Sequence, residues 1–420
     1  MTGPQPARPV PPCARCKCSP GTVTGRNDPL CSTCFISYAR SKPIKRMDPF
    51  RVRNNPTNAP PPLLLLPFSF GVSSLTLLHI LKEHMSSQRT RVGRTGYGLL
   101  VVWVDDSGIS GDGPGSVRKK ETFMGLESHF GGEGSGITFK SVQLEDIYTY
   151  SQPQGAPTSS AEGTNLEKLR VLISSLPSLS SKQDILTTLL TRLFIRLAIQ
   201  HSSPAILFSH STTRLAEKTL SETAKGRGYS VPWSTSDCTI PLPPSQFPHR
   251  KLQTIYPLRD LLKKELHTYL SLTPSLQPFH IPSSSSSSAT PSPQSIIPIS
   301  TAKDTSIDSL MHQYFSQMEQ TYPSIVANVV KTIGRVPAPT HLVALAEVAA
   351  EVEQSVPNCA VCGFPIDIDE ADVWEEEDRD VKKLSVGVLS ELGVGVEELC
   401  GGCRRSLEGA KEGVGARWPL

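Results

Sequence analysis

The middle of the chain alternates between two hydrophobic patterns. Short apolar runs bounded by turn residues, or strict alternation, predict strands in residues 63–66, 96–107 and 136–148. Apolar residues at helical spacing predict helices that start at Leu75 and cover residues 181–200, 256–270 and 309–333. Residues 204–228 combine a short strand, a turn and a helix. Strands that alternate with helices predict an α/β core with a mostly parallel sheet over roughly residues 63–340.

Two stretches interrupt this pattern. Glycine-rich sequence at residues 108–136, with GISGDGPGSVRKK and GGEGSG, predicts a flexible loop. GGEGSG resembles a dinucleotide-binding fingerprint but follows no strand and opens no helix, so it carries no such function. A serine run within residues 280–306 predicts a linker or insertion.

Composition narrows the class of protein. The 420 residues suffice for two or three domains, while 37 prolines and an apolar content of 38% indicate that part of the chain is disordered. A net charge of +3 limits any nucleic-acid surface to a local patch. The N-terminus has no signal-peptide pattern, and the apolar runs fall short of the roughly 20 residues of a membrane helix. We therefore expect a soluble, cytoplasmic protein with no membrane partner.

Eight of the ten cysteines fall into four CxxC pairs. Two pairs are separated by fourteen residues near the N-terminus, and two by thirty-seven near the C-terminus. Paired CxxC knuckles present four thiolates tetrahedrally, as zinc prefers, so two four-cysteine zinc sites are expected; an iron–sulfur cluster is the alternative. The expected ligands are Cys13, Cys16, Cys31 and Cys34, and Cys359, Cys362, Cys400 and Cys403.

The cysteine pairs suggest three regions. Residues 1–60 hold a zinc module and a basic segment, residues 61–340 the α/β core, and residues 341–420 a C-terminal helix and zinc module. Cys18 is a spare thiol beside the first set, able to replace a ligand or to react. Cys238 stands alone in the core, where a solitary cysteine is usually a small buried hydrophobe.

The first predicted strand runs into a modified phosphate loop, PFSFGVSSLTLLHIL at residues 67–81. A strand, a small-residue turn and a helix place backbone N–H groups against a phosphate. The turn, however, has Phe70 where a second glycine would let the backbone approach, and it has no carboxylate. Nucleotide contacts, if they survive, would come from Ser69, Gly71, Ser73 and Ser74.

Together with three further blocks, these features resemble the cytoplasmic tRNA 2-thiolation protein 2 family. The blocks are LFSHSTTRLAEKTLSETAKGRG, YPLRDLLKKELHTYL and FSQMEQTYPSIVANVVKT, and their order and spacing extend the resemblance over nearly the whole chain. The family is similar to the ATP-pyrophosphatase tRNA thiolases. The resemblance therefore implies a sheet of the ATP-pyrophosphatase (adenine nucleotide α-hydrolase-like) type.

The resemblance also implies a function. Members form a heterodimer with a catalytic thiolase paralogue that 2-thiolates the wobble uridine of lysine, glutamine and glutamate tRNAs. The sulfur comes from a thiocarboxylated ubiquitin-like carrier, which links the family to protein urmylation. This chain is thus expected to be a subunit of that complex that supports tRNA binding.

Residue by residue, the resemblance implies lost chemistry. Active thiolases have Ser-Gly-Gly-x-Asp-Ser in the loop, where this chain reads Ser-Phe-Gly-Val-Ser-Ser at residues 69–74. A later His-Asn-Ala-Asp-Asp segment reads His-Ser-Thr-Thr-Arg at residues 210–214, without either acid. Active members also need two core cysteines, and here there is only Cys238. No catalytic residue is therefore assigned, and ATP binding is doubtful.

A basic stretch follows the first cysteines. Such a patch can bind tRNA phosphates, although a solvated linker is an equally good interpretation. Its candidate tRNA-binding residues are Arg40, Lys42, Lys45, Arg46, Arg51 and Arg53.

Two other functions stay open at the level of sequence. The chain could itself be an ATP-dependent tRNA sulfurtransferase, with Cys238 accepting sulfur. Alternatively, the zinc modules could make it a nucleic-acid-binding scaffold unrelated to thiolation.

Overall fold

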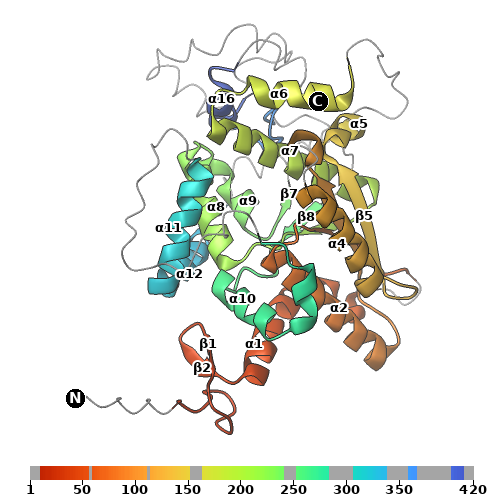
Figure 1. The fold of residues 1–420 in the computed structure, drawn as a ribbon, viewed down its shortest axis with the longest axis vertical. Coiled ribbons are helices and arrows are strands. Elements are labelled where there is room, and N and C mark those ends of the chain that lie inside the picture. Colours follow the sequence, from red (N-terminus) through yellow and green to blue (C-terminus); the bar gives the residue numbers. More distant parts are fainter. Residues whose placement is uncertain are drawn as a thin grey trace, which may run out of the picture.

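A six-stranded sheet forms the core of the molecule (Figure 1). The computed structural model describes residues 10–55, 59–110, 114–151, 163–240, 252–282, 306–337, 358–366 and 399–410. The strands of the sheet are β3 (Leu63–Pro67), β4 (Gly98–Asp105), β5 (Ile137–Gln143), β6 (Ala205–Leu207), β7 (Cys238–Ile240) and β8 (Leu252–Ile255).

The sheet is mostly parallel, as predicted. Its strand order is β5-β4-β3-β6-β8-β7, and only β7 runs antiparallel to its neighbour. The chain starts in the middle with β3, fills one side with β4 and β5, then returns to the other side with β6. The order therefore reverses between β3 and β6, which is the switch point of a doubly wound sheet.

Alternate residues of the strands enter two separate cores. Leu64 and Leu66 of β3 face a core that also contains side chains of α1 (Ser32–Arg46), α2 (Val72–Val92), α4 (Pro114–Phe130) and α10 (Lys263–Ser271). Leu65 faces the opposite core, with α5 (Ile147–Ser151), α6 (Asn165–Ser175) and α7 (Leu179–Gln200). Helices cover both faces because each face of a parallel sheet must be removed from water.

The remaining elements flank this three-layer core. A third cluster packs α8 (Thr212–Ala224) against α11 (Ile307–Thr321) and α12 (Pro323–Ile333). The hairpin β1 (Val23–Gly25) and β2 (Asp28–Leu30) lies at the lower end in Figure 1, and α16 (Gly401–Leu407) lies at the upper end. The shorter segments are α3 (Ser107–Ser110), α9 (Val231–Thr235), η1 (Asp48–Phe50), η2 (Val52–Asn54), η3 (Leu144–Asp146), η4 (Gly228–Ser230) and η5 (Pro274–Phe279).

Three predicted helices have different bounds in the structure. The helix expected from Leu75 begins at Val72, directly after the loop, with Gly71 as its N-cap. The helix expected over residues 256–270 begins only at Lys263, because residues 256–262 form a buried turn whose leucines imitate helical spacing. The helix expected over residues 309–333 is two helices, separated at Tyr322.

The loop prediction for residues 108–136 is wrong over most of its length. Residues 114–130 form α4, which buries Phe123, Leu126 and Phe130. These three side chains have the spacing of one helix face. The glycine-rich sequence on both sides of the segment favoured a loop instead, so the helix was not predicted. The predicted insertion at 280–306 lies outside the described residues except for 280–282 and 306.

No helix among the described residues has the length and apolar character to cross a membrane.

Candidate functional site

The modified phosphate loop lies at the switch point of the sheet. It follows the carboxyl end of β3, and the segment at residues 208–211 follows the carboxyl end of the adjacent β6. In open α/β sheets, ligands bind at this edge, where the strand order reverses. The sequence therefore placed the candidate nucleotide site where this fold normally binds its ligand.

Phe70 fills the core beneath this loop. Its side chain is 1% exposed and packs with its ring centroid 5.3 Å from that of Trp103 and 5.2 Å from that of Phe68. The backbone of Phe70 has a φ of 58°, a left-handed conformation that normally favours glycine. The loop thus keeps the turn that a glycine would adopt and adds an aromatic anchor on its inner side.

The four candidate nucleotide-binding residues lie together, but largely bond to one another. The Ser74 hydroxyl donates to the Gly71 carbonyl oxygen over 3.1 Å and accepts from the Ser69 backbone N–H over 3.4 Å. Ser73 is partly exposed on the first turn of α2. No carboxylate of this loop is available to bind a metal ion beside a phosphate, since the loop has none.

The segment after β6, at residues 210–214, makes hydrogen bonds that hold neighbouring helices in place. Ser211 caps α8, the Thr212 hydroxyl donates to the Arg259 carbonyl oxygen over 2.7 Å, and the Thr213 hydroxyl donates to Glu319 over 2.9 Å. The same Glu319 oxygen accepts the backbone N–H of Lys264, near the start of α10. Sequence reasoning missed Glu319, which lies more than fifty residues from the groups that it joins.

Among the described residues, neither His210 nor Cys238 contacts a group that could act with it in catalysis. His210 stacks against Phe208 and Tyr256, and burial followed by the charges of Lys218 and Arg214 holds its pKa well below the usual range. The Nδ1 atom of His210 has no hydrogen-bond partner among the described residues. Burial also raises the pKa of the Cys238 thiol, so this cysteine is a poor nucleophile.

The N-terminal cysteines converge as predicted. The sulfurs of Cys13, Cys16, Cys31 and Cys34 all lie within 4.8 Å of one another. Four thiolates about 2.3 Å from one tetrahedral ion lie about 3.8 Å apart, and Cys16 and Cys31 are 3.9 Å apart. The backbone N–H of Cys16 holds the pKa of Cys13 low, at about 6, which favours the thiolate that a metal needs. Cys18 stays exposed, and its thiol donates to the Cys16 carbonyl oxygen.

The C-terminal cysteines form a second, more deeply buried set. Cys359, Cys362, Cys400 and Cys403 also lie within 4.8 Å of one another, and the sulfurs of Cys362 and Cys400 are 3.8 Å apart. Cys400 is the N-cap of α16, so the helix start and the ligand turn are the same structure. Both sets fit a single tetrahedral ion in donor type and spacing.

Two arginines from the core reach this second set. Arg227 donates to the Cys403 sulfur over 3.4 Å, and Arg192 of α7 donates to the carbonyl oxygens of Ala360 and Val361 over 2.8 Å each. Neither arginine was predicted, since no local motif connects either of them to cysteines more than 130 residues away.

The first four residues of the basic stretch lie on α1 and the last two lie at the short turns η1 and η2, and part of the stretch is already paired. Arg40 lies 3.5 Å from Glu83, Arg46 pairs with Asp237 and Asp260, and both later arginines, Arg51 and Arg53, lie near Asp48. Lys42 lies over the ring of Tyr38, and Lys45 has no ion pair in the described part of the chain. The two lysines are therefore the members of the patch most available to an outside anion.

Comparisons with known proteins agree with this geometry. The family model described as cytoplasmic tRNA 2-thiolation protein 2 matches residues 306–391. Proteins of that name from Pyrenophora tritici-repentis and Phaeosphaeria nodorum are 38% and 37% identical to this chain, each alignment covering 84% of both chains. The one from Aspergillus clavatus is 30% identical over 84% of this chain and 87% of its own.

A solved structure resembles the fold. It is the U34-tRNA thiolase NcsA from Methanococcus maripaludis with its [4Fe-4S] cluster, at a TM-score of 0.50 and 16% identity, covering 77% of this chain and 87% of that chain. Fold and comparison together define an α/β protein of the ATP-pyrophosphatase type with a four-cysteine set at each end. Within that class, the identity to curated relatives over most of the chain shows that it belongs to the cytoplasmic tRNA 2-thiolation protein 2 family.

Proposed function

We propose that this chain is a non-catalytic subunit of the cytoplasmic complex that 2-thiolates the wobble uridine of lysine, glutamate and glutamine tRNAs. It forms a heterodimer with the catalytic thiolase and helps to hold the tRNA. The sulfur comes from a thiocarboxylated ubiquitin-like carrier. Family membership supports the thiolation pathway, and the altered switch point supports the absence of catalysis.

The observation that carries the second part is the loop at residues 69–74. Its inner side is filled by Phe70, the hydroxyls of Ser69 and Ser74 bond within the loop, and it has no acid. Binding of ATP with a metal ion needs backbone N–H groups and a carboxylate at such a site. An independent sulfurtransferase would need this loop chemistry, which the chain lacks. Burial also raises the thiol pKa of the partly buried Cys238, which makes it a poor nucleophile.

We further propose that both four-cysteine sets bind zinc. Zinc favours four thiolates in a closed tetrahedron, and the sulfur spacings of 3.8 and 3.9 Å suit one ion. A four-iron cluster would have to hold the thiolates farther apart, since its irons and sulfides lie between them.

The test is single-turnover thiolation of unthiolated lysine tRNA with ATP and a sulfur donor. Three reactions are compared: this chain alone, the catalytic thiolase alone and the mixture. We expect fast product formation only in the mixture. Product from this chain alone would show that the loop still works, and equal rates with and without this chain would remove its role as a subunit.

A further inference from the structure

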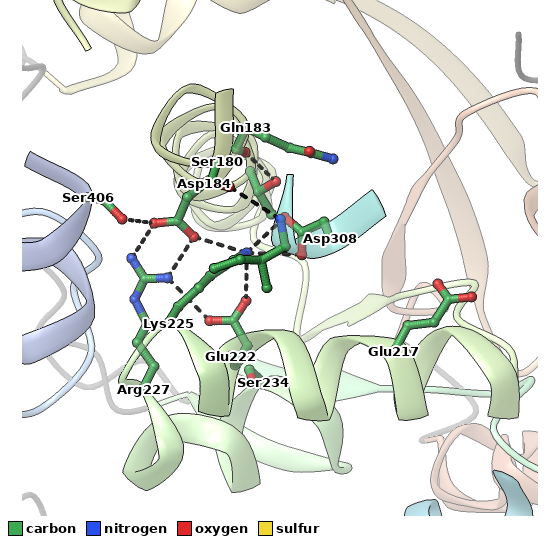
Figure 2. A network of polar contacts seen from close by, with 12 residues as sticks. Ser180, Gln183, Asp184, Glu217, Glu222, Lys225, Arg227, Ser234, Asp308 and Ser406 are labelled. Atoms are coloured by element: carbon green, nitrogen blue, oxygen red, sulfur yellow. Dashed lines mark hydrogen bonds and ion pairs between the residues drawn. The ribbon is translucent and has the colours of Figure 1, made fainter. Parts of the chain in front are cut away.

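A buried ionic network is centred on Asp184, Lys225 and Arg227 (Figure 2), and Arg227 also contacts the C-terminal cysteine Cys403. At its centre, the Arg227 guanidinium holds both oxygens of Asp184, with N–O distances of 2.7 and 2.6 Å. The two residues are 3% and 2% exposed. Bidentate arginine–carboxylate pairs are strong and directional, and breaking one in the interior leaves an unpaired charge.

The network links four helices. Arg227 follows α8 and also donates to Glu222 of that helix over 3.3 Å, while Asp184 belongs to α7. Lys225 lies 3.2 Å from Asp184 and 2.8 Å from Asp308 of α11. The Ser406 hydroxyl of α16 donates to Asp184 over 2.6 Å. A change at α16 therefore has a direct path of contacts to α7, α8 and α11.

The network also touches the second four-cysteine set. Arg227 donates to the Cys403 sulfur, and its side chain lies tightly against the ligand turn. A Cβ atom added to Gly402 would lie 2.3 Å from the Arg227 Cγ and 2.8 Å from its Nε. Since real Cβ atoms do not approach so closely, the glycine makes room for the arginine. A Cβ atom on the adjacent Gly401 would meet nothing nearer than 3.6 Å.

Charge explains why arginines lie here. Four thiolates around one divalent ion carry a net charge of −2, and burying such a charge is costly unless cations and hydrogen bonds compensate it. Arg192 and Arg227 place N–H donors at this set, and Arg227 shares its positive charge between Cys403 and the carboxylates of Asp184 and Glu222. The N-terminal set differs in burial, because three of its four cysteines are partly exposed, whereas three of the four C-terminal cysteines are buried.

We propose that Arg227 couples the metal occupancy of the C-terminal four-cysteine set to the packing of α7, α8 and α11. That centre and the core then form one cooperative unit, whereas the N-terminal centre exchanges its metal independently. Arg227 acts as a positioning residue. It contacts the Cys403 sulfur and also holds the carboxylate of Asp184, so the position of that sulfur affects the position of α7. The proposal rests on metal binding at both sets and not on the thiolation role, so its test needs neither tRNA nor the partner.

The test measures zinc release and local unfolding together. The zinc-loaded full chain is mixed with excess chromogenic chelator, and amide hydrogen exchange is followed by mass spectrometry at the same times. We expect a fast and a slow zinc, with exchange in α7 and α8 rising at least tenfold only as the slow zinc leaves. Release of both zincs without any change in those helices would overturn the proposal.

Two variant pairs assign the effect to Arg227. Arg227→Met should speed release of the slow zinc at least tenfold and leave the fast zinc unchanged, and Arg227→Lys should give an intermediate rate. Gly402→Ala should act like Arg227→Met by displacing the guanidinium, whereas the matched Gly401→Ala should behave as wild type. If Gly402→Ala and Gly401→Ala release the slow zinc at the same rate, the contact with Arg227 does not matter.

Discussion

At the scale of single residues, the loop at the switch point keeps the turn of a phosphate loop but uses Phe70 to pack the core. Phe70 occupies a backbone conformation suited to glycine, yet its ring is part of an aromatic cluster with Phe68, Trp103 and Phe123. The sequence indicated that Phe70 hinders phosphate approach, but not that it anchors the core. Only the packing of α4 over the sheet, which sequence analysis missed, reveals that second role.

Phe70→Ala should lower the free energy of unfolding by about 3–5 kcal/mol, because it leaves a cavity in a packed aromatic core. Urea unfolding followed by circular dichroism measures this change. Ser73→Ala, on the partly exposed side of the same loop, should change it by less than about 0.5 kcal/mol. Similar small effects for both variants would contradict the anchoring role.

His79 should make stability depend on pH. Burial, reinforced by the charge of Arg40, lowers its pKa to about 4, while an unfolded histidine titrates near 6.5. The unfolded chain therefore binds more protons between these values, and stability falls as the pH drops from about 6.5 to 4. Because His79 is partly exposed, we expect a loss of roughly 1–2 kcal/mol.

The comparison that checks this is wild type against His79→Gln, which can still bond to the Tyr269 hydroxyl. Thermal unfolding at several pH values should show the two stabilities converging below pH 6. Any metal released by acid affects both proteins alike, so the difference isolates His79. Parallel curves over the whole range would show that His79 does not titrate as expected.

At the scale of elements, α7 was predicted well, whereas α4 was missed and three other helices have different bounds. The helix at 181–200 is α7, within two residues of the expected start. In contrast, residues 256–262 have helical spacing but form a turn, because their backbone follows β8 and packs under α8 and α10. Hydrophobic spacing reports burial, and a buried turn gives the same signal as a helix face.

Helix α1 is where the tRNA proposal can be tested at this scale. Lys42→Glu with Lys45→Glu should weaken tRNA binding at least tenfold, because neither lysine has an ion pair within the described residues. The salt dependence should also fall, by a slope of about 0.7–0.9 per lost phosphate contact. The complex with the catalytic thiolase is titrated with tRNA at several salt concentrations.

The control for this tRNA titration is a variant with the same change in charge on a different helix. Lys331→Glu with Arg335→Glu, exposed at the end of α12, should leave the affinity within about twofold if recognition depends on local charge. Equal weakening by both pairs would mean that only the net charge matters. No weakening by the α1 pair would remove this helix from the tRNA surface.

At the scale of the whole molecule, the two four-cysteine sets belong to opposite ends, since the β1–β2 hairpin lies at the lower end of Figure 1 and α16 at the upper end. The N-terminal set lies beside a two-stranded hairpin and is tied to α10 by Arg26, whose backbone N–H donates to Glu265 over 2.8 Å. Three cysteines of the C-terminal set are buried members of the second hydrophobic core, whereas only Cys13 of the N-terminal set is a buried member of the first. We therefore expect the loss of metal from the C-terminal set to destabilise the protein more than its loss from the N-terminal set.

Elemental analysis should find two zinc ions and no iron per chain. Cys16→Ser should reduce this to one zinc and lower the melting temperature by a few degrees. Cys359→Ser should also leave one zinc but lower the melting temperature more, because more of the lost site is buried in a hydrophobic core. Iron in the purified protein, or an equal loss of stability for the two variants, would contradict this expectation.

The sequence alone determined the class of fold, the membership of both four-cysteine sets, the altered loop and the family resemblance. These features depend on local spacing, on residue type and on motif order, which the chain carries directly. Only the tertiary structure decided which charges meet. Arg227, Asp184 and Cys403 come from three distant parts of the chain, and Glu319 joins segments from two others. Long-range contacts of this kind leave no periodic signal, because folding alone brings their partners together.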